Sequence, residues 1–208
     1  MNRLTLSDVK NLHDYELIRD DWKRDVIAAK ARRRVVLGEW ISLVFENRLT
    51  VLHQIQEMCR VERIVKPEAV QQELDVYNEL LPDAGELAAT LLVEITDVDR
   101  VKDELDKLLG LTSGEHLWLE IAGRRVFARF LGGQSREDRI AAVQYVRFPV
   151  GNDPETRAAL ESGPLPVVLH IAHPHVRASA LLPPETRREL ARDLVPDAEP
   201  ARARLDRD

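Results

Sequence analysis

The chain has 208 residues, of which 44% are hydrophobic and 32% charged, a composition typical of a globular protein and not of a disordered one. Thirty basic and 36 acidic residues give a formal net charge of −6, so we expect no nucleic acid as a partner. A single cysteine, Cys59, excludes an intrachain disulfide and any zinc site or cluster built from several cysteines. Without an apolar run typical of a signal peptide or membrane span, we expect a soluble cytoplasmic protein with no membrane insertion.

The first part of the chain is predicted to be helical, with one hairpin between its helices. Within residues 1–30, apolar side chains recur every three or four positions, which predicts a first amphipathic helix. The run at 34–46 contains two β-branched and aromatic stretches around a short Gly-Glu turn, which is typical of a hairpin. Two further helices are expected at about 49–65 and 67–79, the second beginning with a proline.

The rest of the chain is predicted to alternate irregularly between strands and helices. In order, these are a strand at 87–95, a helix from 96 to 109, strands at 115–121 and 124–130, a short helix at 136–141, a strand at 143–150, a helix at 153–161, a strand at 167–172 and a helix from 183 to 194. This order favours an α+β fold with a mixed, largely antiparallel sheet and flanking helices.

The domain organisation follows from the same pattern. We expect a single α+β domain at 1–195, divisible into a helical part at 1–80 and a sheet-rich part at 85–195. Beyond it, residues 196–208 are rich in Pro, Ala and Arg without periodicity, and they are expected to form a frayed tail. Residues 66–110 hold twelve acids and four bases, a net of −8, which suggests intramolecular complementarity or a polar docking surface.

Side chains that form directional hydrogen bonds, namely amides, guanidinium groups and carboxylates, are concentrated on and around the predicted helix at 49–65. One arc of this helix is apolar and includes Cys59, which we interpret as a buried apolar residue and not as a nucleophile. The opposite arc is polar, and it is either a solvated face or a binding stripe in which cations and amides converge on a ligand. The candidate ligand- or partner-binding residues are Arg48, Gln54, Gln56, Glu57, Arg60 and Arg63.

Glu62 is out of place in this helix, because it falls in the middle of the apolar arc, seven residues after Ile55. A buried carboxylate without a partner costs several kcal/mol. Either the helix ends before Glu62, or an arginine meets the carboxylate. We expect a buried ion pair with Arg48 as the first choice and the arginines at 32–34 as the alternatives.

Three of the six histidines, His170, His173 and His175, lie close together near the end of the chain. Neutral imidazole is a good ligand for zinc, iron, nickel or copper. On an extended chain, however, His170 points to the opposite side from His173 and His175. We therefore expect no stoichiometric metal and predict no cofactor, with these histidines as weak candidates only. Known catalytic signatures are absent from the sequence, so whether the protein is an enzyme stays open.

Three blocks of sequence carry a family resemblance, at 43–50, 54–63 and 73–82. With Tyr15, Arg19, the run at 33–38 and His173-Pro174, they resemble the bacterial family known as domain of unknown function 3501 over most of residues 4–195. The family has no established activity, so the resemblance implies no catalytic residue. Its genes often lie near those of rubrerythrin-like proteins and of iron–sulfur proteins similar to heterodisulfide reductase subunits. That neighbourhood implies an accessory role in a redox or oxidative-stress module.

Three hypotheses follow from these observations. The first is a non-catalytic accessory protein that binds a redox partner, an iron–sulfur or rubrerythrin-like protein. The second is an enzyme or a small-anion or ligand-binding protein that uses the polar block at 46–63. The third is metal binding by the C-terminal histidines. The oligomeric state is left open by the sequence.

Overall fold

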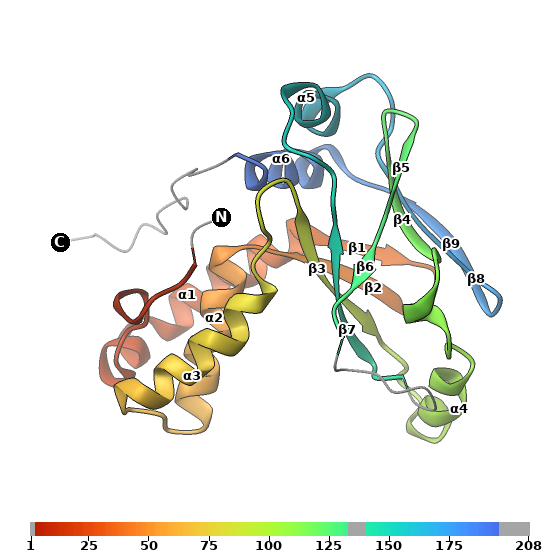
Figure 1. Ribbon diagram of the computed structural model, residues 1–208. Helices are drawn as coiled ribbons and strands as arrows, with labels where there is room; N and C mark the ends of the chain where they lie inside the picture. Colours follow the sequence, from red (N-terminus) through yellow and green to blue (C-terminus); the bar gives the residue numbers. More distant parts are fainter. Residues whose placement is uncertain (1–2, 133–139, 196–208) are drawn as a thin grey trace.

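The computed structural model describes residues 3–132 and 140–195. Within these residues, a layer of N-terminal helices and two antiparallel sheets are arranged side by side (Figure 1). The predicted α+β class is confirmed, although the strands divide between two sheets instead of forming one. The predicted short helix at 136–141 lies mostly outside the described residues, and so does the predicted tail at 196–208.

The helical layer is built from three helices of the first 80 residues. They are α1 (Leu12–Arg33), α2 (Arg48–Val61) and α3 (Pro67–Tyr77), with short 3₁₀ turns at Leu6–Asp8 and Asn78–Leu80. Asn11 caps α1 and Asn47 caps α2, because each side chain accepts a hydrogen bond from an otherwise unpaired backbone N–H. Pro67 occupies the first turn of α3, as predicted, where its missing N–H costs no helical hydrogen bond.

Sheet A lies next to these helices and has the strand order β1-β2-β3-β7-β6. Its strands are β1 (Arg34–Leu37), β2 (Ile41–Glu46), β3 (Leu87–Val93), β7 (Val143–Phe148) and β6 (Arg129–Phe130). The predicted hairpin at 34–46 is confirmed as the antiparallel pair β1–β2. Because β1 and β2 belong to this sheet, the N-terminal 80 residues contribute to both layers and are not purely helical.

Sheet B has the order β5-β4-β8-β9. Its strands are β5 (Arg124–Phe127), β4 (Leu117–Ile121), β8 (Val168–His173) and β9 (Val176–Leu181). The last of these was not predicted. The strand predicted at 124–130 is divided at Ala128, after which the chain leaves sheet B and pairs with β7 in sheet A as β6.

Three further helices flank the sheets. They are α4 (Val101–Asp106), between 3₁₀ turns at Val98–Arg100 and Leu111–Ser113, then α5 (Pro154–Ser162) and α6 (Pro184–Asp193). In Figure 1, α5 and α6 lie at one end of the sheets and α4 at the other. No helix among the described residues is long and apolar enough to cross a membrane.

The two largest apolar clusters of the described residues hold these layers together. The larger one lies between the sheets and includes Leu43, Phe45, Leu91 and Leu119. A second cluster, under α2 and α3, contains Val51, Ile55, Leu74 and the fully buried Cys59, as the helical pattern predicted. Sheet A therefore has one face on sheet B and the other toward the helices, and the second face is where the candidate site lies.

Candidate binding site

The predicted polar block does not form one surface, because most of its members hold the N-terminal helices together. Glu57 accepts hydrogen bonds from the Tyr15 hydroxyl at 2.6 Å, from Arg19 at 2.8 and 3.0 Å, and from Arg60 at 3.2 and 3.3 Å. The Arg19 bonds are the largest cause of the lowered pKa of Glu57, against the opposing effect of burial. Glu57 thus links α1 to α2 and is already fully engaged.

Gln56 was expected on the open polar arc of the helix, and the structure contradicts this. Its side chain is completely buried. Its amide accepts from the backbone N–H of Lys10 at 2.9 Å and donates to the Lys10 carbonyl at 2.8 Å. The segment before α1 covers this part of α2, and Gln56 supplies the partners that the covered backbone needs. Gln56 is therefore a structural residue.

The expected buried ion pair between Glu62 and Arg48 is wrong. Helix α2 ends at Val61, and Glu62 is an exposed C-cap residue. Arg48 instead contacts the carboxylate of Asp8 and donates to the carbonyl of Arg3 at 2.9 Å, which holds the N-terminal segment on α2.

The ending of α2 explains the error. The next residue, Arg63, has a left-handed φ of 56°, and the N–H of Ile64 bonds back to the Cys59 carbonyl at 2.8 Å. This Schellman arrangement brings Ile64 into the second apolar cluster in place of Glu62. Arg63 itself is exposed, outside the contacts that join Arg60 to Glu57.

One member of the block, Gln54, leads to a group that the sequence did not single out as a site. It donates at 3.4 Å to Glu46, whose side chain is only 3% exposed. The same carboxylate accepts from Thr50 at 2.5 Å and from Thr90 at 2.6 Å. Glu46 therefore sits where β2 ends and α2 begins, held by neutral donors and close to the positive end of the helix dipole.

One tyrosine, Tyr145, is close enough to this carboxylate to feel its charge, and a second, Tyr77, is in turn close to Tyr145. Tyr145, on β7, is paired across the strands with Thr90, and Tyr77 is the last residue of α3. Both are partly exposed and pack on the second apolar cluster. Burial raises the pKa of Tyr145, and the charge of Glu46 raises it further.

The pKa of Tyr77 is also raised, first by burial and then by the nearby charges of Glu73, Tyr145 and Glu62. These charge effects connect two tyrosines and three carboxylates that come from four elements, namely β2, the end of α2, α3 and β7. Sequence reasoning missed the group. The available signal was Glu46, an acid on a strand face otherwise shared by Trp40, Ser42 and Val44.

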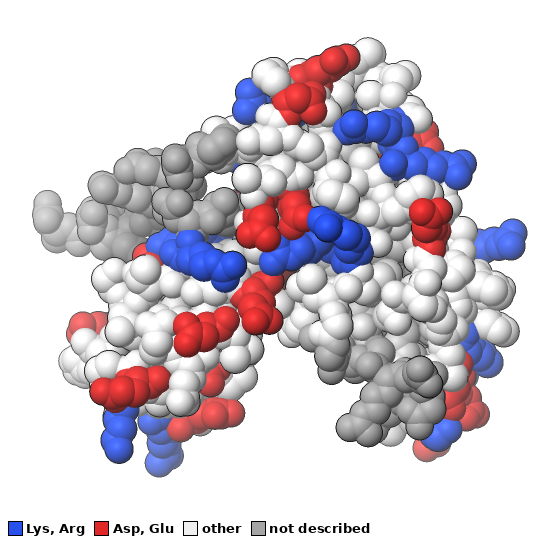
Figure 2. All heavy atoms as spheres, viewed as in Figure 1, with Lys and Arg blue, Asp and Glu red and all other residues white. Residues whose placement is uncertain are grey.

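The surface is hollowed at this place, between α2 and α3 on one side and β3 and β7 on the other (Figures 1 and 2). We call it the acidic hollow and define it by six residues: Glu46, Gln54, Glu62, Glu73, Tyr77 and Tyr145. Acidic side chains lie over α3 beside it in Figure 2. Two residues after Tyr145 on β7, Arg147 is already bound to Asp83 and Glu86, and it donates to the Glu79 carbonyl at 2.6 Å.

The three C-terminal histidines are not brought together as a metal site. His170 stacks on Trp118 on one side of β8, with ring centroids 4.9 Å apart. His173 points to the other side, where it is 3% exposed, contacts the Leu109 carbonyl at 3.1 Å and lies against His116. Among residues 3–132 and 140–195, no group of three His, Cys, Asp or Glu is placed to hold a metal ion.

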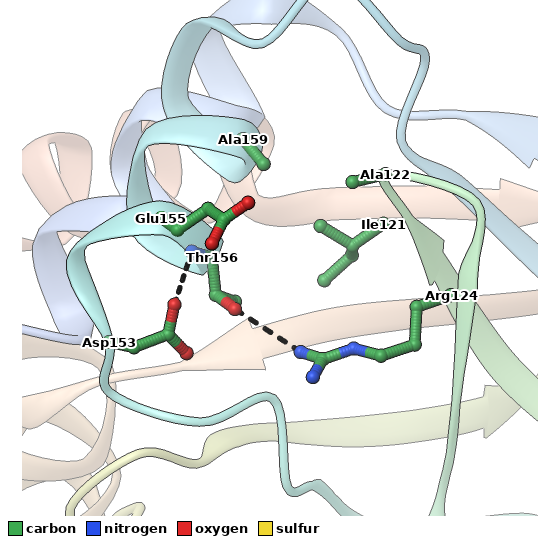
Figure 3. A pocket seen from close by; sticks show the side chains of 7 residues that line it. All are labelled: Ile121, Ala122, Arg124, Asp153, Glu155, Thr156 and Ala159. Atoms are coloured by element: carbon green, nitrogen blue, oxygen red, sulfur yellow. Dashed lines mark hydrogen bonds between the residues drawn. The ribbon is translucent and has the colours of Figure 1, made fainter.

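A pocket of about 400 Å³ lies on sheet B between the β4–β5 turn and the start of α5 (Figure 3). Its cation, Arg124, donates to the Val150 carbonyl at 2.8 Å and to Thr156 at 3.2 Å. Asp153 accepts from the Thr156 N–H at 2.7 Å and caps α5. These bonds hold α5 against the β-turn, and no residue predicted as a binding site from the sequence lies here.

Comparison with known proteins identifies a family and a similar solved structure. Residues 3–194 match the model of a family described as protein of unknown function (DUF3501). The crystal structure of a novel protein of unknown function from Burkholderia pseudomallei K96243 is similar with a TM-score of 0.83 and 30% sequence identity. The similarity covers 93% of this chain and 100% of that one. A search of curated proteins gave no match. The match over nearly the whole chain shows that this protein belongs to the DUF3501 family.

Proposed function

We propose that this protein is a non-catalytic accessory protein and that the acidic hollow is the surface on which it binds a basic region of a partner protein. One observation carries the proposal: among the described residues, Glu46, Glu62 and Glu73 form no ion pair, although arginine partners meet the acids at the other junctions of the fold. A carboxylate without a counter-charge in the protein is available to one on a partner.

The state of the ionisable groups supports binding over acid–base chemistry. A general acid or base works best when its pKa lies near the ambient pH. Here the pKa values of Tyr77 and Tyr145 are raised away from neutrality, and that of Glu57 is lowered away from it. The small-anion alternative at 46–63 is less favoured, because Arg19, Arg48 and Arg60 are already bound to carboxylates.

The charge distribution supports a basic partner. On α3 and just beyond it the exposed or partly exposed acids are Glu68, Glu73, Asp75 and Glu79, against Lys66 alone. An unbalanced patch of this kind raises the rate of encounter with an oppositely charged protein and selects against acidic ones. These acids of α3 also enlarge the negatively charged surface beyond the tyrosines of the hollow.

For the partner we propose an iron–sulfur or rubrerythrin-like protein of the same organism, in keeping with the redox neighbourhood that the family resemblance implies. This chain has one cysteine, which is buried, and burial raises the pKa of its thiol. A buried thiol of raised pKa is unreactive, so in this proposal the partner performs the redox chemistry. The proposed location is the cytoplasm, where such partners would be reduced.

The test is direct binding between purified proteins. The two partner candidates are immobilised separately, and binding of the wild-type chain is compared with binding of the double variant Glu62→Gln, Glu73→Gln by interferometry. We expect saturable binding to one of them, weakened about tenfold or more by the double variant and by raising the salt from about 50 to 200 mM.

The matched control is the double variant Glu68→Gln, Asp75→Asn, which removes the same amount of charge from α3 without touching the residues that define the hollow. It is expected to bind within about twofold of wild type, because rim charges contribute little to affinity. Binding to neither candidate, or equal weakening by both double variants, would contradict the proposed function.

A further inference from the structure

The acidic hollow has a chemistry more specific than negative charge. We infer that it receives one protruding Lys or Arg side chain of the partner, with the cationic head at Tyr77 and Tyr145 and the counter-charges supplied by Glu46, Glu62 and Glu73. This inference rests on the proposed function and adds the class of group that is recognised.

The first argument is the arrangement of the two tyrosines. They come from α3 and β7, and each is partly exposed while the rest of its ring packs on the second apolar cluster. No described residue forms a hydrogen bond with either hydroxyl, so both phenol oxygens are available to an incoming donor. An aromatic face attracts a cation within about 6 Å of the ring centroid, and nearby carboxylates reinforce that attraction.

The second argument is the depth of the charge. Glu46 is almost completely buried and is satisfied by three neutral donors, Thr50, Gln54 and Thr90. Its hydrogen bonds are made, and among the described residues it forms no ion pair, although it lies near the positive end of the α2 dipole. A cation at Tyr145 would lie beside this charge in a partly desolvated setting, where the attraction is stronger than at an open surface.

The third argument concerns the shape of the ligand. Leu92 and Val143 are cross-strand partners on the same face of sheet A as Thr90 and Tyr145. Val143 is 39% exposed and Leu92 partly so. This apolar strip leads along the sheet to the tyrosines and suits an aliphatic stem that carries its charge at the end, as in lysine and arginine. A bare metal ion would gain nothing from it, and no described group of ligands is placed to hold one.

The chain offers an internal reference for testing this inference, because it has only three tyrosines. Tyr15 is completely buried between α1 and α2 and donates to Glu57. Tyrosine labelled with ¹³C at the ring Cζ alone therefore gives three resonances, which Tyr→Phe variants assign. We expect a blocked trilysine or triarginine peptide to shift the resonances of Tyr77 and Tyr145 in a saturable way and to leave Tyr15 unmoved.

Variants then separate the ring contribution from general charge. Tyr145→Leu is expected to weaken peptide binding by about tenfold, through loss of the cation–π contact. Because Tyr145 also packs on the second apolar cluster, Glu73→Gln serves as a second variant without that role, with an expected loss of about threefold. Asp75→Asn, on another side of α3, is the control and should bind as wild type does.

Three results would overturn the inference. The first is a peptide that shifts the resonances of all three tyrosines or of none. The second is an equal loss of peptide affinity in Glu73→Gln and Asp75→Asn. The third is that spermidine, a free polyamine of the same charge as blocked trilysine, binds more than tenfold tighter than both peptides. The last result would assign the hollow to a small metabolite. The proposed function can stand when this inference fails. If the partner binds and the Glu62→Gln, Glu73→Gln variant abolishes binding, yet complex formation leaves Tyr77 and Tyr145 unchanged, the docking surface stands and the side-chain assignment falls.

Discussion

The ion pair between Arg33 and Asp193 joins α1 to α6, 160 residues apart in the sequence, and allows a quantitative test of the fold. Arg33, the last residue of α1, donates to Asp193 in α6 at 2.7 and 2.5 Å. The two side chains are 1% and 8% exposed. Burial raises the pKa of Asp193 to about 6 against the lowering effect of Arg33, so the carboxyl is ionised at pH 7.5.

The perturbation is Asp193→Asn, which keeps the shape and one acceptor but leaves a buried guanidinium without its charge partner. Removing one member of a buried pair costs about 3–5 kcal/mol. Glu189 lies 4.0 Å from Arg33 and retains part of the attraction, so we expect the lower end, about 3 kcal/mol. At about 2–4 °C per kcal/mol for a chain of this size, Tm should fall by about 6–12 °C.

The assay is thermal and urea unfolding followed by circular dichroism at pH 7.5. The control is Asp21→Asn, which removes an acid in contact with Arg24 on the exposed side of α1, where the side chains are 78% and 74% exposed. It should change the unfolding free energy by less than about 0.5 kcal/mol. A double variant, Arg33→Met with Asp193→Leu, should recover most of the loss, because apolar replacement of a whole buried pair is often neutral. If Asp193→Asn lowers Tm by less than about 2 °C, the pair behaves as a surface pair and the reasoning is refuted.

Two further outcomes are expected. Gln56→Ala leaves the Lys10 N–H and carbonyl without their side-chain partners, so the free energy of unfolding in urea should fall by about 2–3 kcal/mol. Replacing a surface glutamine would lower it by less than about 0.5 kcal/mol, and a loss that small would mean that Gln56 lies on the exposed polar arc of the helix. Burial, with smaller effects of His116 and His175, lowers the pKa of His173 below its unfolded value of about 6.5. As the pH falls below about 6.5, the unfolded chain therefore binds the proton before the folded chain does, and the free energy of unfolding decreases. His173→Phe should therefore lose less unfolding free energy than wild type between pH 7.5 and 5.5, and an equal loss would mean that this histidine does not titrate on unfolding.

Local patterns predicted most of the elements of this fold. The hairpin at 34–46 and the helices α1 and α3 follow from periodicity and from a proline at a helix start, because these signals act over a few residues. Strand β9 was missed because its sequence, with two alanines and a serine, carries little apolar alternation, and its neighbour β8 determines its conformation.

The errors at α2 have a common physical origin in contacts from distant parts of the chain. A helical projection places Gln56 on the polar arc, but the backbone at Lys10 covers that position in the folded chain. The same projection extends the helix through Glu62, but a non-glycine residue, Arg63, adopts the left-handed conformation and ends it. Such an ending has little signal in the sequence, because glycine is the usual residue at this position.

The candidate site could be predicted only in part, for the same reason. Gln54, which bonds Glu46, was identified from the sequence, whereas Tyr145 is brought opposite Thr90, the other partner of Glu46, by the pairing of β3 with β7, more than 50 residues further along the chain. The strand register that brings Thr90 between Glu46 and Tyr145 is a property of sheet A as a whole. Sequence reasoning can identify an acid on an apolar strand face, but it cannot identify what that acid will face.

The distribution of arginines among the acids suggests how structure and function are divided in this protein. The acids that join α1 to α2 and α1 to α6 are each met by an arginine, and these pairs bind the chain to itself. At the hollow, Glu62 and Glu73 remain unpaired among the described residues, although Arg60 and Arg63 are close in sequence. Pairing within the chain would have stabilised α2 and α3 slightly, by about 0.3–0.5 kcal/mol for each surface pair. Leaving the charges open forgoes little stability and retains an electrostatic field that reaches about 8 Å into the solvent at physiological salt, which is the range at which a basic partner is first attracted.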